Sequence, residues 1–180
     1  YGKNLVGTFY QPDLVVIDPS VLNSLTLKQI KSGYAEILKH ALINDKNFFQ
    51  WLKKNIDNLF KLKKDVLLYA ITKSINIKAK YVMKDEKETL INSSSRAMLN
   101  FGHTFGHAIE TMDQYRSNLT HGEAISIGMA LAVKISYKLN HIKKHEHDDI
   151  INHLKQAGLP YSTLSTKKNK IYNIITFDKK

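Results

Sequence analysis

Two histidines four residues apart, His103 and His107, stand in the segment LNFGHTFGHAIE among small and apolar residues. On a helix this spacing stacks both side chains on one face, about one turn apart. Such a pair can bind one metal ion, can be two hydrogen-bonded core histidines, or can divide into one ligand and one catalytic group. The spacing alone leaves these three interpretations open.

Two further segments place ionisable residues in apolar helical surroundings. SGYAEILKH sets Glu36 three residues before Lys39, and LTHGEAISIGMA sets His121 before a glycine at the start of an apolar helix. Taken alone, Glu36 is more often a solvated ion-pair partner and a lone histidine more often a core residue. Taken together, one glutamate and two or three histidines favour a zinc site. Three protein ligands would leave coordination positions open for Lewis-acid chemistry.

A third histidine-rich segment, HIKKHEH, contains His141, His145 and His147. It also has the composition of a metal-binding tract, but its histidines stand among lysines in a polar stretch. We predict a solvated surface there, because charge-rich helical faces are usually exposed.

The sequence around these residues predicts a helical body that follows an N-terminal segment with a strand. Apolar spacing predicts helices over 27–43, 45–62 with Asp45 as N-cap, 65–83, 96–112 and 121–139, and a last helix that ends at Gly158 and Pro160. Residues 89–95, with three consecutive serines, predict a loop. The N-terminal segment is interrupted by glycines and prolines, and its run LVVID, 14–18, predicts a buried strand.

Composition narrows the class of protein. The 180 residues contain no cysteine, which excludes disulfides and thiolate metal sites and is compatible with a reducing cytoplasm. The chain contains no run of about 18 apolar residues, so no membrane span is predicted. The net charge of +11 favours anionic partners, such as phosphorylated metabolites, nucleic acid or acidic membranes, although a lysine-rich proteome explains most of the dispersed lysines. Because the chain begins at Tyr1, we expect an upstream piece to be missing.

Five ordered segments resemble successive motifs of the 3-dehydroquinate synthase family: GKNLVGTFYQP, SGYAEILKHALINDKNFFQWL, KAKYVMKDEKE, RAMLNFGHTFGHAIE and LTHGEAISIGMA. They extend from Lys3 to Met129, and the final FDKK resembles a lysine-bearing segment near the family's C-terminus. The resemblance implies a mainly α fold, the helical metal-binding C-terminal domain of a two-domain α/β + α enzyme. Residues 1–20 would then be the strand-containing end of a Rossmann-like NAD-binding domain, and 21–180 the helical zinc- and substrate-binding domain.

The resemblance also implies roles for individual residues. The family's zinc ligands fall on Glu36, His103 and His121, whereas His107 matches a histidine that faces substrate. Polar active-site positions fall on Lys39, Lys78, Glu88, Arg96 and Asn100. Lys3 and Asn4 match residues near the cofactor and the substrate phosphate, and the segment of Val21, Leu22, Asn23 and Ser24 matches one that touches NAD. The loop 89–95 departs from the family, because it is longer than usual and lacks the expected glycine.

The activity implied by the resemblance is the conversion of 3-deoxy-arabino-heptulosonate 7-phosphate into 3-dehydroquinate and phosphate, a step of the shikimate pathway. The reaction requires NAD⁺, which is regenerated, and a metal ion, either Zn²⁺ or Co²⁺ in place of Zn²⁺. Lys39, Lys78 and Arg96 would supply positive charge for the anionic sugar phosphate, with Asn4, Asn100 and His107 as phosphate-side donors. We expect a cytoplasmic homodimer at full length, no nucleic-acid or membrane partner, and no activity of this chain alone.

Three other interpretations compete with this one. Another sugar-phosphate cyclase of the same superfamily would share zinc, NAD and most motifs. A basic helical nucleic-acid-binding module would group its Lys and Arg residues on one face, but gives no reason for Glu36, His103 and His121 in apolar surroundings. The chain could also be a truncated, inactive remnant.

Overall fold

The computed structural model describes residues 10–112 and 119–162. Its elements are the 3₁₀-helix η1 (Pro19–Ser24), α1 (Leu27–Asn44), α2 (Lys46–Phe60), α3 (Lys64–Lys84), the 3₁₀-helix η2 (Arg96–Asn100), α4 (His103–Met112), α5 (His121–Lys138) and α6 (Lys144–Gln156). No strand occurs in these residues. The prediction of a mainly α fold is confirmed. None of the described helices is long and apolar enough to cross a membrane.

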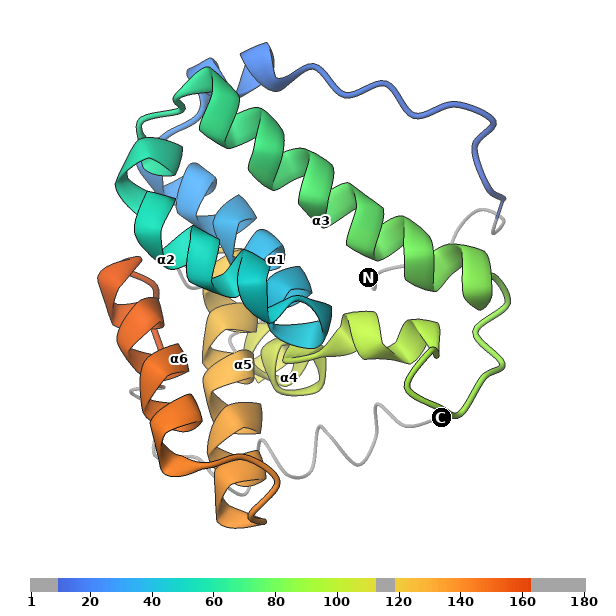
Figure 1. Cartoon of the computed structure of the whole chain (residues 1–180), viewed down its shortest axis with the longest axis vertical. Coiled ribbons are helices and arrows are strands. Elements are labelled where there is room, and N and C mark those ends of the chain that lie inside the picture. Colours follow the sequence, from blue (N-terminus) through green and yellow to red (C-terminus); the bar gives the residue numbers. More distant parts are fainter. Residues whose placement is uncertain (1–9, 113–118, 163–180) are drawn as a thin grey trace.

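Helix α1 is the centre of the bundle and contacts α2, α3 and α5. Helix α3 lies on one side of α1 and α2, and α5 and α6 run antiparallel and side by side on the other (Figure 1). Leu38 of α1, Leu52 of α2 and Met129 of α5 are fully buried in the shared core, which also includes Leu154 of α6. This packing fixes α1, which carries Glu36, against the start of α5, which carries His121.

Local sequence explains where the helices begin. Thr26 and Gln29 form a capping box at the start of α1, and the side chain of Asp45 accepts a hydrogen bond of 2.8 Å from the backbone N–H of Phe48. The predicted N-cap role of Asp45 is therefore confirmed. The predicted helix stop is also confirmed, since α6 ends at Gln156 and Gly158 adopts a positive φ of 63°.

Two predictions from the sequence are wrong in detail. Residues 14–18 form no strand, and Leu14, Val15 and Val16 are 66–81% exposed. A strand needs a neighbouring strand to pair its backbone groups, and the described residues offer none. The single helix expected over 96–112 is broken after η2, because Gly102 has a positive φ of 80° that ends one helical segment before α4 begins.

Small residues allow three helices to approach closely at the site. A side chain on Gly128 of α5 would overlap the carbonyl oxygen of Gly102, and one on Gly122 would overlap the carbonyl oxygen of Ser32 in α1. The backbone N–H of Gly122 also donates to Ser32 Oγ at 3.0 Å. The Gly122 contact holds the start of α5 against α1, and the Gly128 contact holds the start of α4 against α5. The histidines that begin both helices therefore lie close to Glu36.

Candidate metal and substrate site

His103 and His121 occupy equivalent positions, because each is the first residue of its helix. A capping box between Thr120 and Glu123 fixes the start of α5, with the Thr120 N–H donating to the Glu123 carboxylate at 2.7 Å. The positive end of a helix dipole disfavours a protonated imidazole. For His103, the lowered pKa of its imidazole has the direction that this position predicts.

Glu36 of α1 completes a group of three potential metal ligands. Its Oε1 lies 3.6 Å from His103 Nε2 and 3.7 Å from His121 Nε2, and the ligand atoms of all three residues lie within 4.8 Å of one another. Glu36 Oε1 is also the buried side-chain polar atom that has no hydrogen-bond partner among the described residues. Leaving such an oxygen unpaired costs about 1–3 kcal/mol, so it is rarely tolerated without a ligand. The donor set and the unpaired oxygen fit a divalent cation such as Zn²⁺.

The outer ring nitrogens of both histidines have acceptors. His121 Nδ1 lies 3.0 Å from Glu110 Oε1, and His103 Nδ1 lies 3.4 Å from the carbonyl oxygen of Phe101. Because carbonyl and ionised carboxylate oxygens only accept hydrogen bonds, each Nδ1 must carry the proton. Each Nε2 then keeps its lone pair directed toward Glu36, which is the tautomer that a metal site requires.

Lys39 controls the charge of this group. Its ammonium is buried and donates to Glu36 Oε2 at 2.7 Å. Burial raises the pKa of Glu36, but Lys39 and the two histidines outweigh it and hold that pKa below its ordinary value. Burial and the charge of Lys39 also lower the pKa of His103 to about 4. At neutral pH the carboxylate is ionised and His103 is neutral, as ligation requires.

A cavity of about 310 Å³ opens beside this group, and three of its lining side chains are cations. We call it the site pocket. It is lined by Glu36, Lys39, His40, Lys78, Glu88, Arg96, Leu99, Asn100 and His103. Lys78 comes from α3 and Arg96 from η2, so three separate elements bring their cations to one space. The five polar positions that the resemblance implied, Lys39, Lys78, Glu88, Arg96 and Asn100, thus lie together beside Glu36 and His103.

The buried carboxylate of Asp85 positions the loop that carries Glu88 and Arg96. It accepts hydrogen bonds from the backbone N–H groups of Thr89 at 2.7 Å, Leu90 at 3.2 Å and Arg96 at 2.9 Å. Burial raises the pKa of Asp85, but these hydrogen bonds outweigh it and keep that pKa below its ordinary value. Residues 89–95 are a loop, as predicted.

His107 lies next to the first group of ligands, and its role is not decided by position alone. Its ring centroid is 5.2 Å from that of His103 and 6.1 Å from that of His121. His107, Glu110 and His121 form a second set whose ligand atoms lie within 4.8 Å of one another. In that set, however, Glu110 Oε1 already accepts from His121, whereas Glu36 Oε1 has no such partner. The geometry therefore favours the Glu36 group for the metal.

The remaining candidate residues lie elsewhere. Val21, Leu22, Asn23 and Ser24 belong to η1, where Asn23 and Ser24 donate to nearby backbone carbonyls, and none of them lines the site pocket. Lys3 and Asn4 lie outside the described residues. In HIKKHEH, His141 and His145 are exposed and His147 contacts Asp148. That segment is a surface, as predicted.

Three residues of the site were missed from the sequence. Glu110 follows His107 by three positions and His103 by seven, which is one helix face. His40 follows Glu36 by four positions and lines the site pocket, where Ser74 Oγ lies 2.6 Å from its Nδ1. Burial and the charge of Lys39 lower the pKa of His40 to about 4. Helical spacing could have indicated Glu110 and His40. For Asp85, the third residue, the sequence offered only its position directly after the last residue of α3.

Comparison with known families gives matches over the whole chain. The family model described as 3-dehydroquinate synthase C-terminal matches residues 33–180, and the model described as 3-dehydroquinate synthase N-terminal matches residues 1–32. A 3-dehydroquinate synthase from Caldanaerobacter subterraneus subsp. tengcongensis is 42% identical over 179 residues, and one from Thermodesulfovibrio yellowstonii is 45% identical over 180. The alignments cover 99% of this chain and 49% of each relative. The chain therefore spans about half the length of the curated relatives it matches.

Solved structures share the fold. The 2-epi-5-epi-valiolone synthase ValA from Streptomyces hygroscopicus subsp. jinggangensis, solved with NAD⁺ and Zn²⁺, matches with a TM-score of 0.86 at 23% identity, over 97% of this chain and 48% of that one. A 2-deoxy-scyllo-inosose synthase complexed with carbaglucose-6-phosphate, NAD⁺ and Co²⁺ matches with a TM-score of 0.73 at 30% identity, over 97% and 46%.

Proposed function

Because this chain belongs to the 3-dehydroquinate synthase family, we propose that it supplies the metal- and substrate-binding part of an enzyme with that activity. The reaction is the NAD- and zinc-dependent conversion of 3-deoxy-arabino-heptulosonate 7-phosphate into 3-dehydroquinate and phosphate. The observation that carries the proposal is the unpaired buried oxygen of Glu36, which faces Nε2 of both His103 and His121 beside a basic pocket.

Glu36, His103 and His121 are the proposed ligands of Zn²⁺, with Co²⁺ as a substitute. The ion would supply a Lewis acid that lowers the pKa of a substrate hydroxyl. Three protein ligands leave room for substrate oxygens, so a fourth from His107 would take a position that the substrate needs. Glu110 keeps His121 in the required tautomer, at 3.0 Å from its Nδ1.

The site pocket is the proposed site of the anionic sugar phosphate. Lys39, Lys78 and Arg96 bring three positive charges to one cavity with Asn100 as a neutral donor, and Arg96 suits bidentate contact with a carboxylate. The Arg96 guanidinium is already tethered by donating to the carbonyl oxygen of Glu86 at 3.0 Å. Its position is therefore partly fixed before substrate arrives, which lowers the entropic cost of binding.

His107 is the proposed hydrogen-bonding or proton-transfer group on the substrate side. It lies one helical turn beyond His103 on α4, and its ring is adjacent to both proposed histidine ligands. An imidazole that is not bound to metal can donate a hydrogen bond to phosphate and can exchange a proton near neutral pH. Glu88, on the loop anchored by Asp85, is a further polar group and lines the site pocket.

The domain organisation is part of the same proposal. Residues 1–20, with Lys3 and Asn4, would end an NAD-binding domain, and residues 21–24 would touch NAD, while 21–180 form the zinc and substrate domain. Because hydride transfer needs the nicotinamide held against the substrate, the chain by itself should not turn over. The complete enzyme would be a cytoplasmic homodimer without nucleic-acid or membrane partners.

A related cyclase activity is the second candidate, because the 2-deoxy-scyllo-inosose synthase that shares this fold was solved with a phosphorylated carbasugar. The test is release of inorganic phosphate by the full-length protein with NAD⁺ and Zn²⁺, offered the heptulosonate 7-phosphate or a hexose 6-phosphate. We expect release from the heptulosonate alone. Release from the hexose phosphate alone would favour the second candidate, and release from neither would contradict both.

A further inference from the structure

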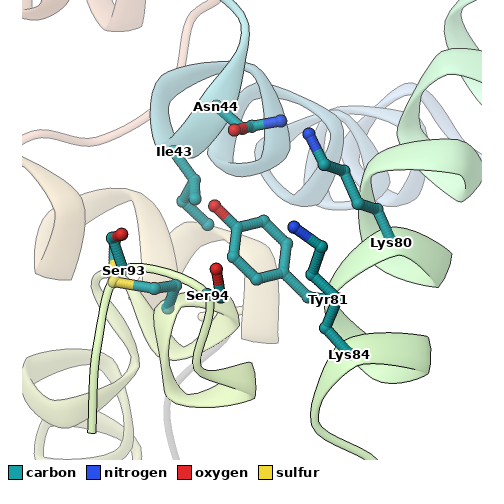
Figure 2. Close-up of a pocket in the computed structure, with 8 residues that line it drawn as sticks. Ile43, Asn44, Lys80, Tyr81, Lys84, Ser93 and Ser94 are labelled. Atoms are coloured by element: carbon teal, nitrogen blue, oxygen red, sulfur yellow. The ribbon is translucent and has the colours of Figure 1, made fainter. Parts of the chain in front are cut away.

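A second polar cavity, of about 270 Å³, shares a loop with the site pocket but none of its residues. We call it the Lys80–Lys84 pocket. It is lined by Ile43 and Asn44 of α1, Lys80, Tyr81 and Lys84 of α3, and Ser93, Ser94 and Met98 (Figure 2). The loop between α3 and η2 gives Ser93 and Ser94 to this cavity, while its ends give Glu88 and Arg96 to the site pocket.

The Lys80–Lys84 pocket carries uncompensated positive charge. None of its lining residues is acidic, and neither Lys80 nor Lys84 has an ion-pair partner within the part of the chain that the structure describes. The two lysines are four residues apart on α3, where like charges repel. The C-terminal ends of α1 and α3 contribute only about half a negative charge each. A net attraction for an anion therefore remains.

The other polar groups suit an anion with several oxygens. Figure 2 shows the ammonium groups of Lys80 and Lys84 turned toward Asn44 and Tyr81. Ser94 lines the same cavity. An amide, hydroxyls and two ammonium groups can each donate to a different oxygen. Lysine binds phosphate as a point charge, whereas planar carboxylates favour the fork of arginine. We propose that this pocket binds a phosphate group, either as inorganic phosphate or as a phosphomonoester.

The loop is held in shape without a ligand. Asp85 accepts three backbone N–H groups, as described above, and Asn92 Oδ1 accepts from the N–H of Ser94 at 2.8 Å. Ser93 and Ser94 therefore need little further ordering when an anion binds, which saves free energy of binding. The Lys80–Lys84 pocket includes no proposed zinc or substrate residue, so its test is independent of the proposed function.

The test is amide NMR of the full chain during titration with inorganic phosphate at constant ionic strength, with sodium chloride as the matched control. We expect saturable shifts of the Ser93 and Ser94 amides with phosphate and none with chloride. Asn100 and His103 report the site pocket separately. Glycerol 3-phosphate, titrated in parallel, identifies the source of the phosphate group by which of the two anions binds more tightly.

Variants decide whether the two lysines are responsible. In Lys80→Gln/Lys84→Gln, the Kd reported by Ser93 and Ser94 should rise about tenfold or more, because both charged hydrogen-bond donors to the phosphate are removed. Lys54→Gln/Lys61→Gln, which removes two exposed lysines elsewhere, should change Kd less than about twofold. Ser94→Ala provides a second, uncharged variant and should also weaken binding. Unchanged binding in the Lys80/Lys84 variant, or equal shifts with chloride, would overturn the proposal.

Discussion

Two histidines withdrawn from solvent, His103 and His153, show how a histidine of the proposed metal site differs from a core histidine. His153 of α6 is 1% exposed, its Nε2 lies 2.5 Å from the Tyr34 hydroxyl, and its Nδ1 lies 3.4 Å from Gln156 Oε1. His103 is 13% exposed, and its Nε2 faces a carboxylate oxygen 3.6 Å away that has no partner. Burial lowers the pKa of both.

The difference lies in what the hydrogen bonds leave unsatisfied. Around His153, the aromatic rings of Tyr34 and Phe49 and two polar partners complete the environment. Around His103, charge and lone pairs converge from three helices and remain incomplete. A lowered histidine pKa is therefore found both in the core and at the site. What distinguishes the site is that potential metal-ligand atoms converge there and that one of them, Glu36 Oε1, has no hydrogen-bond partner.

The largest effect should follow removal of a ligand from the Glu36 group. His103→Ala in the full-length protein should lose stoichiometric zinc after dialysis together with turnover, because two ligands cannot hold the ion as three do. His153→Ala is the matched control and should retain zinc in whatever fraction folds. Metal analysis after gel filtration measures both. Full zinc in His103→Ala would remove the distinction between the two histidines.

His107 tests whether proximity to the group is enough to make a ligand. His107→Ala should keep near-stoichiometric zinc while turnover of the full-length protein falls about 10²–10⁴-fold, the range for loss of a general acid or base. His145→Ala, at an exposed position, should change neither quantity. If His107→Ala strips zinc as completely as His103→Ala, the division between ligand and substrate group is wrong.

Glu110 tests whether the carboxylate behind His121 supports that histidine as a zinc ligand. Glu110→Ala should weaken zinc affinity about 10–100-fold, as is usual when the carboxylate behind a metal-bound histidine is removed. Glu110→Gln keeps an acceptor for Nδ1–H and should recover part of the loss. Competition with a chromogenic chelator measures the affinity. A larger loss in Glu110→Ala than in Glu36→Ala would instead favour the set of His107, Glu110 and His121.

The smallest effect should come from the core histidine. Tyr34→Phe leaves the Nε2 of His153 without its buried partner and should lower the free energy of unfolding by about 1–2 kcal/mol. Zinc affinity should stay the same, since the Tyr34 hydroxyl bonds to His153 and its hydrogen bonds in the described part of the chain include none to a proposed ligand. Urea denaturation and chelator competition on one preparation test both statements. A parallel loss of zinc would show that the two regions are not independent.

Much of this arrangement could be predicted from the sequence, because helical spacing and capping residues are local signals. Asp45 marked the start of α2, and three short motifs indicated Glu36, His103 and His121. Gly102 was misjudged, since a glycine in a periodic segment fits either a helix or its end. The apolar run at 14–18 predicted burial, but burial depends on a partner element that the run itself does not specify.

The partnerships between helices were beyond sequence reasoning. Whether Glu110 meets His121, or His40 meets Ser74, depends on how α4 crosses α5 and how α1 crosses α3. The crossing of α4 and α5 depends on the close contact of Gly128 with Gly102, and Gly122 brings α5 against Ser32 of α1; both contacts join residues that are distant in the sequence. Spacing placed each side chain on a helix face, but only packing decided which faces meet.

The most direct test of the proposed ligand set is X-ray absorption of the zinc-loaded protein, which counts the imidazoles bound to the ion. We expect two imidazole nitrogens at about 2.0–2.1 Å with the remaining ligands oxygen. These imidazoles would be those of His103 and His121, and the Glu36 carboxylate would be one of the oxygen ligands. A spectrum that requires three imidazoles would make His107 a ligand and contradict the account.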